Sequence, residues 1–179
     1  MGNLLERHAG KPFYATEKLD GFSMSFGVVD GDFILSARER MVDEWEDSVF
    51  ADASRELRLR ERVDGAGVLF QGELVGPGIR GNRYRLDGLR LHVFNAIRDG
   101  QFVSFAELET LCRNIGLPVA PILATGFLAT RENALEFACG QSTINPLVER
   151  EGAVFRPVIE TVDEFQGRVS AKVFNPKFG

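Results

Sequence analysis

The chain has 179 residues, enough for one domain with a substantial core, and its formal net charge is −5. Hydrophobic residues make up 44% of the sequence and charged residues 26%, as in ordinary globular proteins, so disordered and fibrous classes are excluded. We expect no transmembrane helix, because no apolar run approaches about 18 residues, and no export, because the N-terminus lacks the apolar core of a signal peptide. The two cysteines, Cys112 and Cys139, predict reduced thiols in a cytoplasmic protein, and two isolated histidines argue against a histidine-based zinc site.

The first predicted element is a β-hairpin that directly follows a Lys-Leu-Asp-Gly sequence at residues 18–21. Apolar residues alternate with small or polar residues over 22–28, which is the period of a half-buried strand. Asp30-Gly31 predicts the turn, and residues 33–35 begin the return strand. Taken alone, this lysine is best explained as a surface residue before a turn. An amine held in a pocket beside other cations, however, can lose its proton and act as a nucleophile.

Helices and further strands follow in mixed order. Apolar side chains at spacings near three and four over residues 43–62 predict one amphipathic helix, with Trp45 facing the core. Ser104 and Glu107 predict a capping box at the start of a second helix, and Thr130 predicts the cap of a third. Strands are predicted over residues 68–75, 89–97, 119–123, 151–157 and 169–174. We therefore expect an α+β protein with antiparallel sheets flanked by helices.

Arginines crowd one stretch of this acidic chain. Residues 80–90 hold four arginines and a single acid, Asp87. The negative total charge argues against binding nucleic acid through bulk positive charge. It leaves open a local basic edge, whose contacts with phosphates would be sensitive to salt.

Six stretches together carry a resemblance to a known family. They are residues 17–21, 35–40, 70–84, 91–97, 150–157 and 170–178. In this order they resemble the nucleotidyltransferase motifs of the ATP-dependent RNA ligases, within the superfamily of covalent nucleotidyltransferases that also holds DNA ligases and mRNA capping enzymes. The most specific part is Gly-Glu-Leu-Val-Gly-Pro-Gly-Ile-Arg-Gly-Asn-Arg-Tyr at residues 72–84, which is similar to RNA ligases of the Deinococcus-type branch. The segment at 36–40 departs from the family, since it reads Ser-Ala-Arg-Glu-Arg where members more often have a Ser-Arg-Asn core.

The resemblance implies a fold and a reaction. The fold is the adenylyltransferase fold of the DNA and RNA ligases, which is ATP-grasp-like, as a single domain over residues 1–179 without an OB-like accessory domain. In the implied reaction, Lys18 attacks the α-phosphate of ATP, expels pyrophosphate and becomes lysyl-AMP. The AMP then passes to an RNA 5′-phosphate, and a 3′-hydroxyl displaces it to seal a phosphodiester.

The resemblance also implies roles for other positions. Glu73 is expected at the ribose and Glu151 at a hydrated Mg²⁺ or Mn²⁺, with Glu73 as a second metal ligand. Phe94 is expected to stack on adenine, Glu17 to read the adenine amino group, and Lys172 to neutralise the α-phosphate. Expected nucleotide-binding positions are Glu17, Asp20, Gly21, Arg38, Glu73, Phe94, Glu151 and Lys172, and expected RNA-binding positions are Arg38, Arg80, Arg83, Arg85 and Lys177. Without the resemblance, Phe94 is better explained as a core residue and each glutamate as a solvated acid at a strand end.

We expect RNA ends or nicked RNA or RNA/DNA duplexes as partners, no membrane, and a monomer. An ATP-dependent DNA ligase fits the same motifs, and so does a non-catalytic nucleotide- or RNA-binding module on this fold. A guanylyltransferase that uses GTP is a weaker alternative. Lys18, Glu73 and Glu151 occur together with Lys172, which favours catalysis because a binding module needs no nucleophile.

Overall fold

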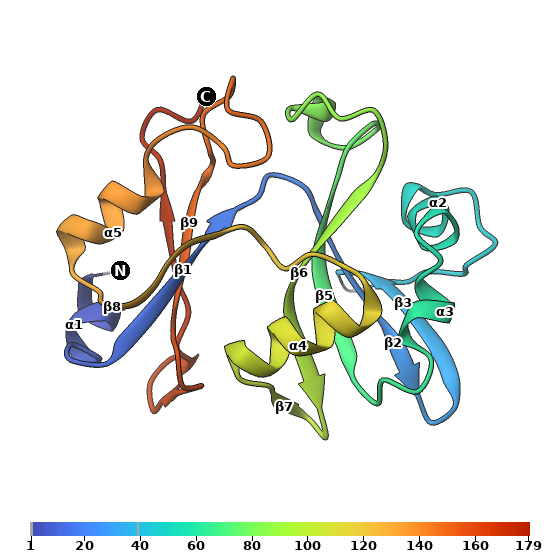
Figure 1. Cartoon of the computed structure of the whole chain (residues 1–179), viewed down its shortest axis with the longest axis horizontal. Helices are drawn as coiled ribbons and strands as arrows, with labels where there is room; N and C mark the ends of the chain where they lie inside the picture. The colour runs from blue at the N-terminus through green and yellow to red at the C-terminus, as the bar shows by residue number, and fades with distance from the viewer. Residues whose placement is uncertain (1, 39) are drawn as a thin grey trace. The chain divides into compact units, whose positions relative to one another are not determined.

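The computed structural model describes residues 2–38 and 40–179, which fall into two compact units (Figure 1). Unit 1 comprises Met1–Leu19 and Ala120–Gly179, and unit 2 comprises Asp20–Val119. Unit 1 is therefore discontinuous in sequence, whereas unit 2 is one continuous stretch. Glu39, which belongs to one of the motif stretches above, lies outside the described residues.

Unit 1 is built on an antiparallel sheet in the order β12-β9-β1-β8. Its elements are α1 (Gly2–Arg7), β1 (Pro12–Lys18), β8 (Ile122–Leu128), α5 (Arg131–Ala138), β9 (Gly152–Pro157), the hairpin β10 (Val162–Asp163) and β11 (Gly167–Arg168), and β12 (Ala171–Phe174). Alternation along β1 places Phe13 and Ala15 in a core with Phe155, and residues of α1 and α5 complete that core. Lys18 and Thr16 consequently lie on the opposite face of the sheet.

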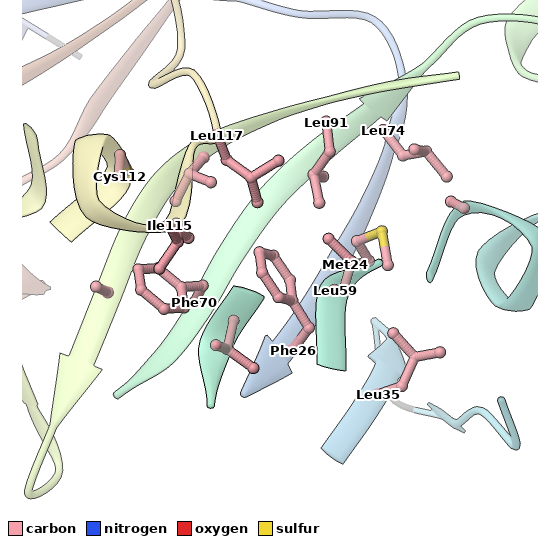
Figure 2. Packing of buried hydrophobic residues seen from close by; sticks show 14 of the residues in the cluster. Met24, Phe26, Leu35, Leu59, Phe70, Leu74, Leu91, Cys112, Ile115 and Leu117 are labelled. Carbon is pink, nitrogen blue, oxygen red and sulfur yellow. The ribbon is translucent and has the colours of Figure 1, made fainter. Parts of the chain in front are cut away.

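Unit 2 is built on an antiparallel sheet in the order β4-β3-β2-β5-β6-β7. Its elements are β2 (Phe22–Val29), β3 (Asp32–Ala37), β4 (Arg40–Met41), α2 (Val49–Glu56), α3 (Leu59–Val63), β5 (Leu69–Val75), the 3₁₀ turn η1 (Arg80–Asn82), β6 (Arg90–Arg98), β7 (Gln101–Phe102) and α4 (Phe105–Ile115). Phe26 and Phe70 stack in its core with ring centroids 5.5 Å apart. Leu59 of α3 and Cys112 of α4 pack in the same cluster (Figure 2), so helices cover this face of the sheet. The predicted α+β architecture with antiparallel sheets flanked by helices is confirmed.

The hairpin that follows the Lys-Leu-Asp-Gly sequence is confirmed. β2 and β3 pair in antiparallel register, with Val29 opposite Asp32 across the turn. Asp30 and Gly31 have φ values of 52° and 88°, and positive φ at both central residues is the requirement of a type I′ turn. The chain therefore enters this hairpin at Phe22, three residues after the turn segment that begins at Leu19.

The prediction of one helix over residues 43–62 is wrong. Ser48 Oγ accepts a hydrogen bond from Ala51 N and so starts α2 at Val49, and Arg58, at a φ of 53°, separates α2 from α3. Trp45 precedes the cap, in a turn where the Asp43 carboxylate accepts a hydrogen bond from Trp45 N, and it is 80% exposed. Hydrogen bonds between short polar side chains and nearby backbone groups therefore decide where the helix begins, although the apolar spacing starts earlier in the sequence.

Further observations concern the N-terminal residues, the cap of α4, the cysteines and the lengths of the helices. Residues 2–7 form α1, for which the sequence predicted no element, and its Leu4 and Leu5 are buried. Ser104 caps α4 as predicted, but the Glu107 carboxylate pairs with Arg98 instead of completing the capping box. Both cysteines are free, as predicted. No helix within residues 2–38 and 40–179 is long and apolar enough to cross a membrane.

Candidate active site

Lys18 is held against the sheet of unit 1 by two contacts. Its ammonium group forms an ion pair with the Glu151 carboxylate, and the two side chains are only 19% and 13% exposed. The Lys18 Nζ atom also lies 5.0 Å from the centroid of the Phe174 ring. The lysine predicted as nucleophile is therefore fixed between a carboxylate and an aromatic face, rather than extended into solvent.

The strand register places Lys18 and Lys172 on one face of this sheet. Lys18 pairs with Gly152, which in turn pairs with Phe174, and the next row across β9 and β12 joins Val154 with Lys172. Paired residues of antiparallel strands share a face, and two strand spacings separate β1 from β12 by about 10 Å. Two cations therefore lie on the same face of this sheet.

Gly152 is required for the close approach of β9 and β12 behind the lysine. A Cβ atom at this position would lie 2.0 Å from the Val173 carbonyl oxygen, a backbone atom that has no freedom to move aside. Gly152 is also the residue after Glu151. The glycine therefore fixes the position of the carboxylate that pairs with Lys18.

The Glu151 carboxylate has a spare oxygen suited to a cation. Its Oε1 atom pairs with Lys18, whereas its Oε2 atom is buried and has no hydrogen-bond partner among the described residues. A buried, unpaired carboxylate oxygen is costly unless a cation or water satisfies it. Within the described ranges, no group of three or more His, Cys, Asp or Glu side chains is arranged to hold a metal. One carboxylate oxygen fits a Mg²⁺ or Mn²⁺ ion that keeps most of its water ligands.

Glu17 points away from Lys18, on the other face of β1. Its carboxylate accepts hydrogen bonds from Ser142 Oγ at 2.5 Å and from Thr143 N at 2.7 Å, and the residue is 2% exposed. These bonds tie β1 to the loop that precedes β9. A contact between Glu17 and adenine, as the resemblance implies, stays a prediction.

Asn175 is a site residue that the sequence did not single out. Its backbone N–H donates to the Glu151 carbonyl oxygen at 2.9 Å, and its amide nitrogen donates to the Arg150 carbonyl at 3.1 Å. The Asn175 Oδ1 atom accepts a hydrogen bond from Lys177 N at 3.0 Å. Asn175 is 3% exposed, so it fastens the segment after Lys172 to the strand end that carries Glu151. An asparagine before a proline is a turn signal that could have indicated this role.

In unit 2, Glu73 lies at the end of β5 beside the Asp20-Gly21 turn. A Cβ atom at Gly21 would lie 2.9 Å from Glu73 Cγ and 2.3 Å from the Leu74 carbonyl oxygen, so only glycine fits here. The Asp20 N–H donates to the Tyr84 hydroxyl at 2.8 Å. The turn after the lysine is thereby packed against β5 on one side and held by the arginine-rich loop on the other.

Phe94 lies on the same face of the unit 2 sheet as Glu73. Glu73 pairs with His92, and Phe94 is the unpaired residue of a β-bulge two positions farther along β6, where it is half-buried while its neighbour Val93 lies in the core. A glutamate and an aromatic ring thus lie together on the face of the sheet opposite the hydrophobic core. This placement is compatible with the adenosine-binding roles that the resemblance implies.

The arginines predicted for RNA separate into two groups. Arg38 and Arg80 line one pocket of unit 2, together with Phe22 and other residues. Arg85 is exposed and Arg83 half-buried in the loop after η1. In unit 1, Lys177 lies beyond β12 and is exposed.

The chain matches a family model described as RNA ligase over residues 11–174. Its fold is similar to that of a lysine variant of Naegleria gruberi RNA ligase with ATP and Mn, with a TM-score of 0.85 and 26% identity. The same ligase with PPi gives a TM-score of 0.84 at 27% identity, and a lysine-to-methionine variant with AMP and Mn gives 0.84 at 26%. Each match covers 97% of this chain and 52% of the other, so this chain spans about half the length of these relatives. No curated protein matches it. The structural matches confirm the predicted fold.

Proposed function

The chain belongs to the RNA ligase family, and on that premise we propose that it is an ATP-dependent RNA ligase or the catalytic part of one. The observation that carries the proposal is the position of Lys18, paired with Glu151 on the sheet face that also holds Lys172. We further propose that both units together form one nucleotidyltransferase domain. Membership of the Deinococcus-type branch stays a prediction.

Complexes of the Naegleria enzyme support the choice of substrate. Structures of that enzyme have been solved with ATP and Mn, with AMP and Mn, and with PPi. ATP is the substrate of an adenylylation step, pyrophosphate is its leaving group, and AMP is the group transferred. We propose the same substrate and products for this chain, with Mg²⁺ or Mn²⁺ as the metal.

The first step would form a bond from Lys18 Nζ to the α-phosphorus of ATP. The lone pair of the amine attacks, the bond from the α-phosphorus to the bridging oxygen breaks, and pyrophosphate leaves with that electron pair. Attack requires a neutral amine, so the proton shared in the Lys18–Glu151 ion pair must first leave the nitrogen. Glu151 is the acceptor in direct contact. Lys172, on the same sheet face, would neutralise the charge that develops on the α-phosphate.

Other residues would hold the nucleotide and the metal. Phe94 would stack on adenine, Glu73 would bind the ribose, and Glu17 would contact the adenine amino group. Glu151 would contribute its free oxygen to the divalent ion, with Glu73 as a second carboxylate. When bound, that ion would add positive charge at the phosphate oxygens.

In the later steps, AMP would pass to an RNA 5′-phosphate, and a 3′-hydroxyl would displace it. Arg38, Arg80, Arg83 and Arg85, with Lys177, are the cations that we assign to the RNA phosphates. We propose that the substrates are RNA ends or nicked duplexes in the cytoplasm and that the protein acts as a monomer.

The decisive experiment is covalent labelling with ATP that carries ³²P at the α-phosphate, in Mg²⁺ or Mn²⁺. We expect label that survives denaturation and that mass spectrometry maps to Lys18. Lys18→Ala should abolish the label, whereas Lys11→Ala, which changes an exposed lysine just before β1, should retain it. ATP binding without label under every metal condition would favour a non-catalytic binding module.

The nucleic acid is tested separately with nicked duplexes that end in a ribose or a deoxyribose 3′-hydroxyl. Faster sealing of the ribose end is expected of an RNA ligase. A preference for the all-DNA nick would establish the DNA ligase alternative instead. Labelling with GTP in place of ATP would identify a guanylyltransferase.

A further inference from the structure

Phe174 and Lys18 meet above a glycine of unit 1. Both residues pair with Gly152 of β9, Lys18 from β1 and Phe174 from β12, so the three lie in one row across the sheet. Two strand spacings separate the outer strands by about 10 Å. Gly152 has no side chain in this gap, whereas Val154 fills the corresponding place in the next row. The Phe174 ring therefore reaches across β9, and its centroid lies 5.0 Å from Lys18 Nζ.

The position of Phe174 is fixed by the residue that follows it. Asn175 N donates to the Glu151 carbonyl oxygen, and the Asn175 amide nitrogen donates to the Arg150 carbonyl oxygen. The ring is thereby fastened to the strand end that also carries Glu151. Phe174 is 59% exposed, so burial in a core does not account for its placement beside the lysine.

The two contacts of Lys18 respond differently when its amine loses a proton. The ion pair with Glu151 requires an ammonium group, whereas the attack proposed above requires a neutral amine. A neutral amine still packs its carbon stem against a phenyl ring and can direct an N–H bond at the ring face. The ring contact therefore outlasts the ion pair. Without it, the long and flexible stem of a lysine would move freely at the moment when its position matters.

We propose that Phe174 is a positioning residue for Lys18. Its ring holds the neutral amine at the sheet face between loss of the ion pair and attack on the α-phosphorus, which favours the geometry of attack. Once the bond from nitrogen to phosphorus has formed, the bound AMP itself holds Nζ in place. The ring therefore acts in the making of lysyl-AMP and not in its breakdown. This proposal rests on the proposed function, because it assumes that Lys18 is the nucleophile.

The first test is the rate of lysyl-AMP formation by the full chain, followed with ³²P-labelled ATP and Mn²⁺ over a range of ATP concentrations. Phe174→Leu keeps an apolar side chain but removes the ring. The rate at saturating ATP should fall about tenfold, and the ATP concentration for half-maximal rate should stay within about twofold, because the ring does not bind the nucleotide. A normal maximal rate, with or without a raised half-maximal concentration, would overturn the proposal.

The reverse reaction separates positioning from general damage to the site. A pyrophosphate oxygen attacks the α-phosphorus of lysyl-AMP, and the nitrogen takes up a proton and leaves as an amine, which regenerates ATP. Labelled protein that has been freed of ATP is mixed with pyrophosphate and Mn²⁺, and the ATP released is measured. Phe174→Leu should release ATP at the normal rate, although it forms lysyl-AMP slowly. Equal slowing in both directions would contradict a role confined to the free lysine.

Two further variants test whether the ring face is the cause. Phe165→Leu is the matched control, because Phe165 is 75% exposed in the same unit and its ring centroid lies 5.6 Å from the Arg7 guanidinium. Phe165→Leu should form lysyl-AMP at the normal rate, since its ring contacts a different cation. Phe174→Tyr presents the same ring face to Lys18 and should restore most of the rate. Slow labelling by Phe174→Tyr would exclude the ring face as the cause.

The hold on the lysine can also be measured without any reaction. The chain has four lysines, so ¹³C-labelled lysine gives few ε-carbon signals, and the signal lost in Lys18→Arg identifies Lys18. Its NMR order parameter should fall in Phe174→Leu and stay unchanged in Phe165→Leu. An equal order parameter in the two variants would overturn the proposal. A chain that takes no label from ATP but shows this difference would refute the proposed function and leave the contact of Phe174 with Lys18 established.

Discussion

The Lys18 ammonium group pairs with the carboxylate of Glu151, the residue just before its register partner Gly152. Glu151→Gln removes the negative charge, the proton acceptor and the free oxygen suited to a cation. We expect lysyl-AMP formation to slow by about 100-fold and to require more Mn²⁺ for half-maximal labelling. Radiolabelling across a Mn²⁺ titration measures both effects.

The control for this prediction is Glu164→Gln, because Glu164 is exposed in the same unit. It should label like the unchanged protein at every metal concentration. A Glu151→Gln protein that labels at the normal rate would remove Glu151 from the chemistry, whatever its contact with Lys18.

Gly152→Ala should destabilise unit 1. The added Cβ would lie 2.0 Å from the Val173 carbonyl oxygen, so β9 and β12 would have to separate. We expect a loss of about 3 kcal/mol in the free energy of unfolding, measured by urea denaturation. Gly88→Ala is the control, because a Cβ there has nothing within 4 Å. Equal stability of both variants would show that the two strands can move apart at little cost.

Asp163 should make the stability of unit 1 depend on pH. Hydrogen bonds from Arg7, together with those from His8 and Phe165 N, hold the pKa of this carboxyl well below its usual value of 3.8. Since the folded-state pKa is lowered, the stabilisation is complete well above pH 4, begins to fall near the unfolded-state pKa, and is lost as pH falls through the lower folded-state pKa. Asp163→Asn should therefore melt at a lower temperature than the unchanged protein at pH 7. The difference should shrink below pH 4 in thermal melts, and a constant difference would contradict the ion pair as its cause.

The two thiols should differ sharply in reactivity. Burial, with a smaller contribution from Glu109, raises the pKa of the Cys112 thiol to about 12, whereas Cys139 is only half-buried. At pH 8 a thiol reagent should modify Cys139 in the folded protein and both cysteines after unfolding. Peptide mapping identifies the modified residue, and rapid modification of Cys112 in the folded state would show that α4 opens readily.

Local signals predicted the hairpin and the caps well, because each depends on a few adjacent residues. Asp30-Gly31 supplied the turn, and Ser104 and Thr130 supplied helix starts. Trp45 was misplaced because apolar spacing alone does not reveal a competing cap at Ser48. The periodicity was real, but a side-chain hydrogen bond decided where the helix begins.

The candidate site was only partly predictable for a different reason. The motif stretches identified Lys18 and Glu151, yet their ion pair depends on the pairing of β1 with β9, which joins residues more than 130 positions apart. The contacts of Asn175 with Arg150 and of Phe174 with Lys18 also join residues that are far apart in the sequence. The residues adjacent to them in the sequence therefore did not reveal these contacts. The pocket at Phe22 and Phe50 likewise depends on how α2 packs on the sheet.

The order in which the chain is made bears on when Lys18 can react. Residues 20–119 form a continuous unit that can fold while translation proceeds at roughly 5–20 residues per second. The strand that carries Lys18 is made first, but its partners β8 and β9 are made after that whole unit, and β12 comes last. A nascent chain that ends within residues 20–119 should therefore carry the nucleophile without the carboxylate or the second lysine. Adenylylation should begin only on chains in which β9 and β12 have left the ribosome.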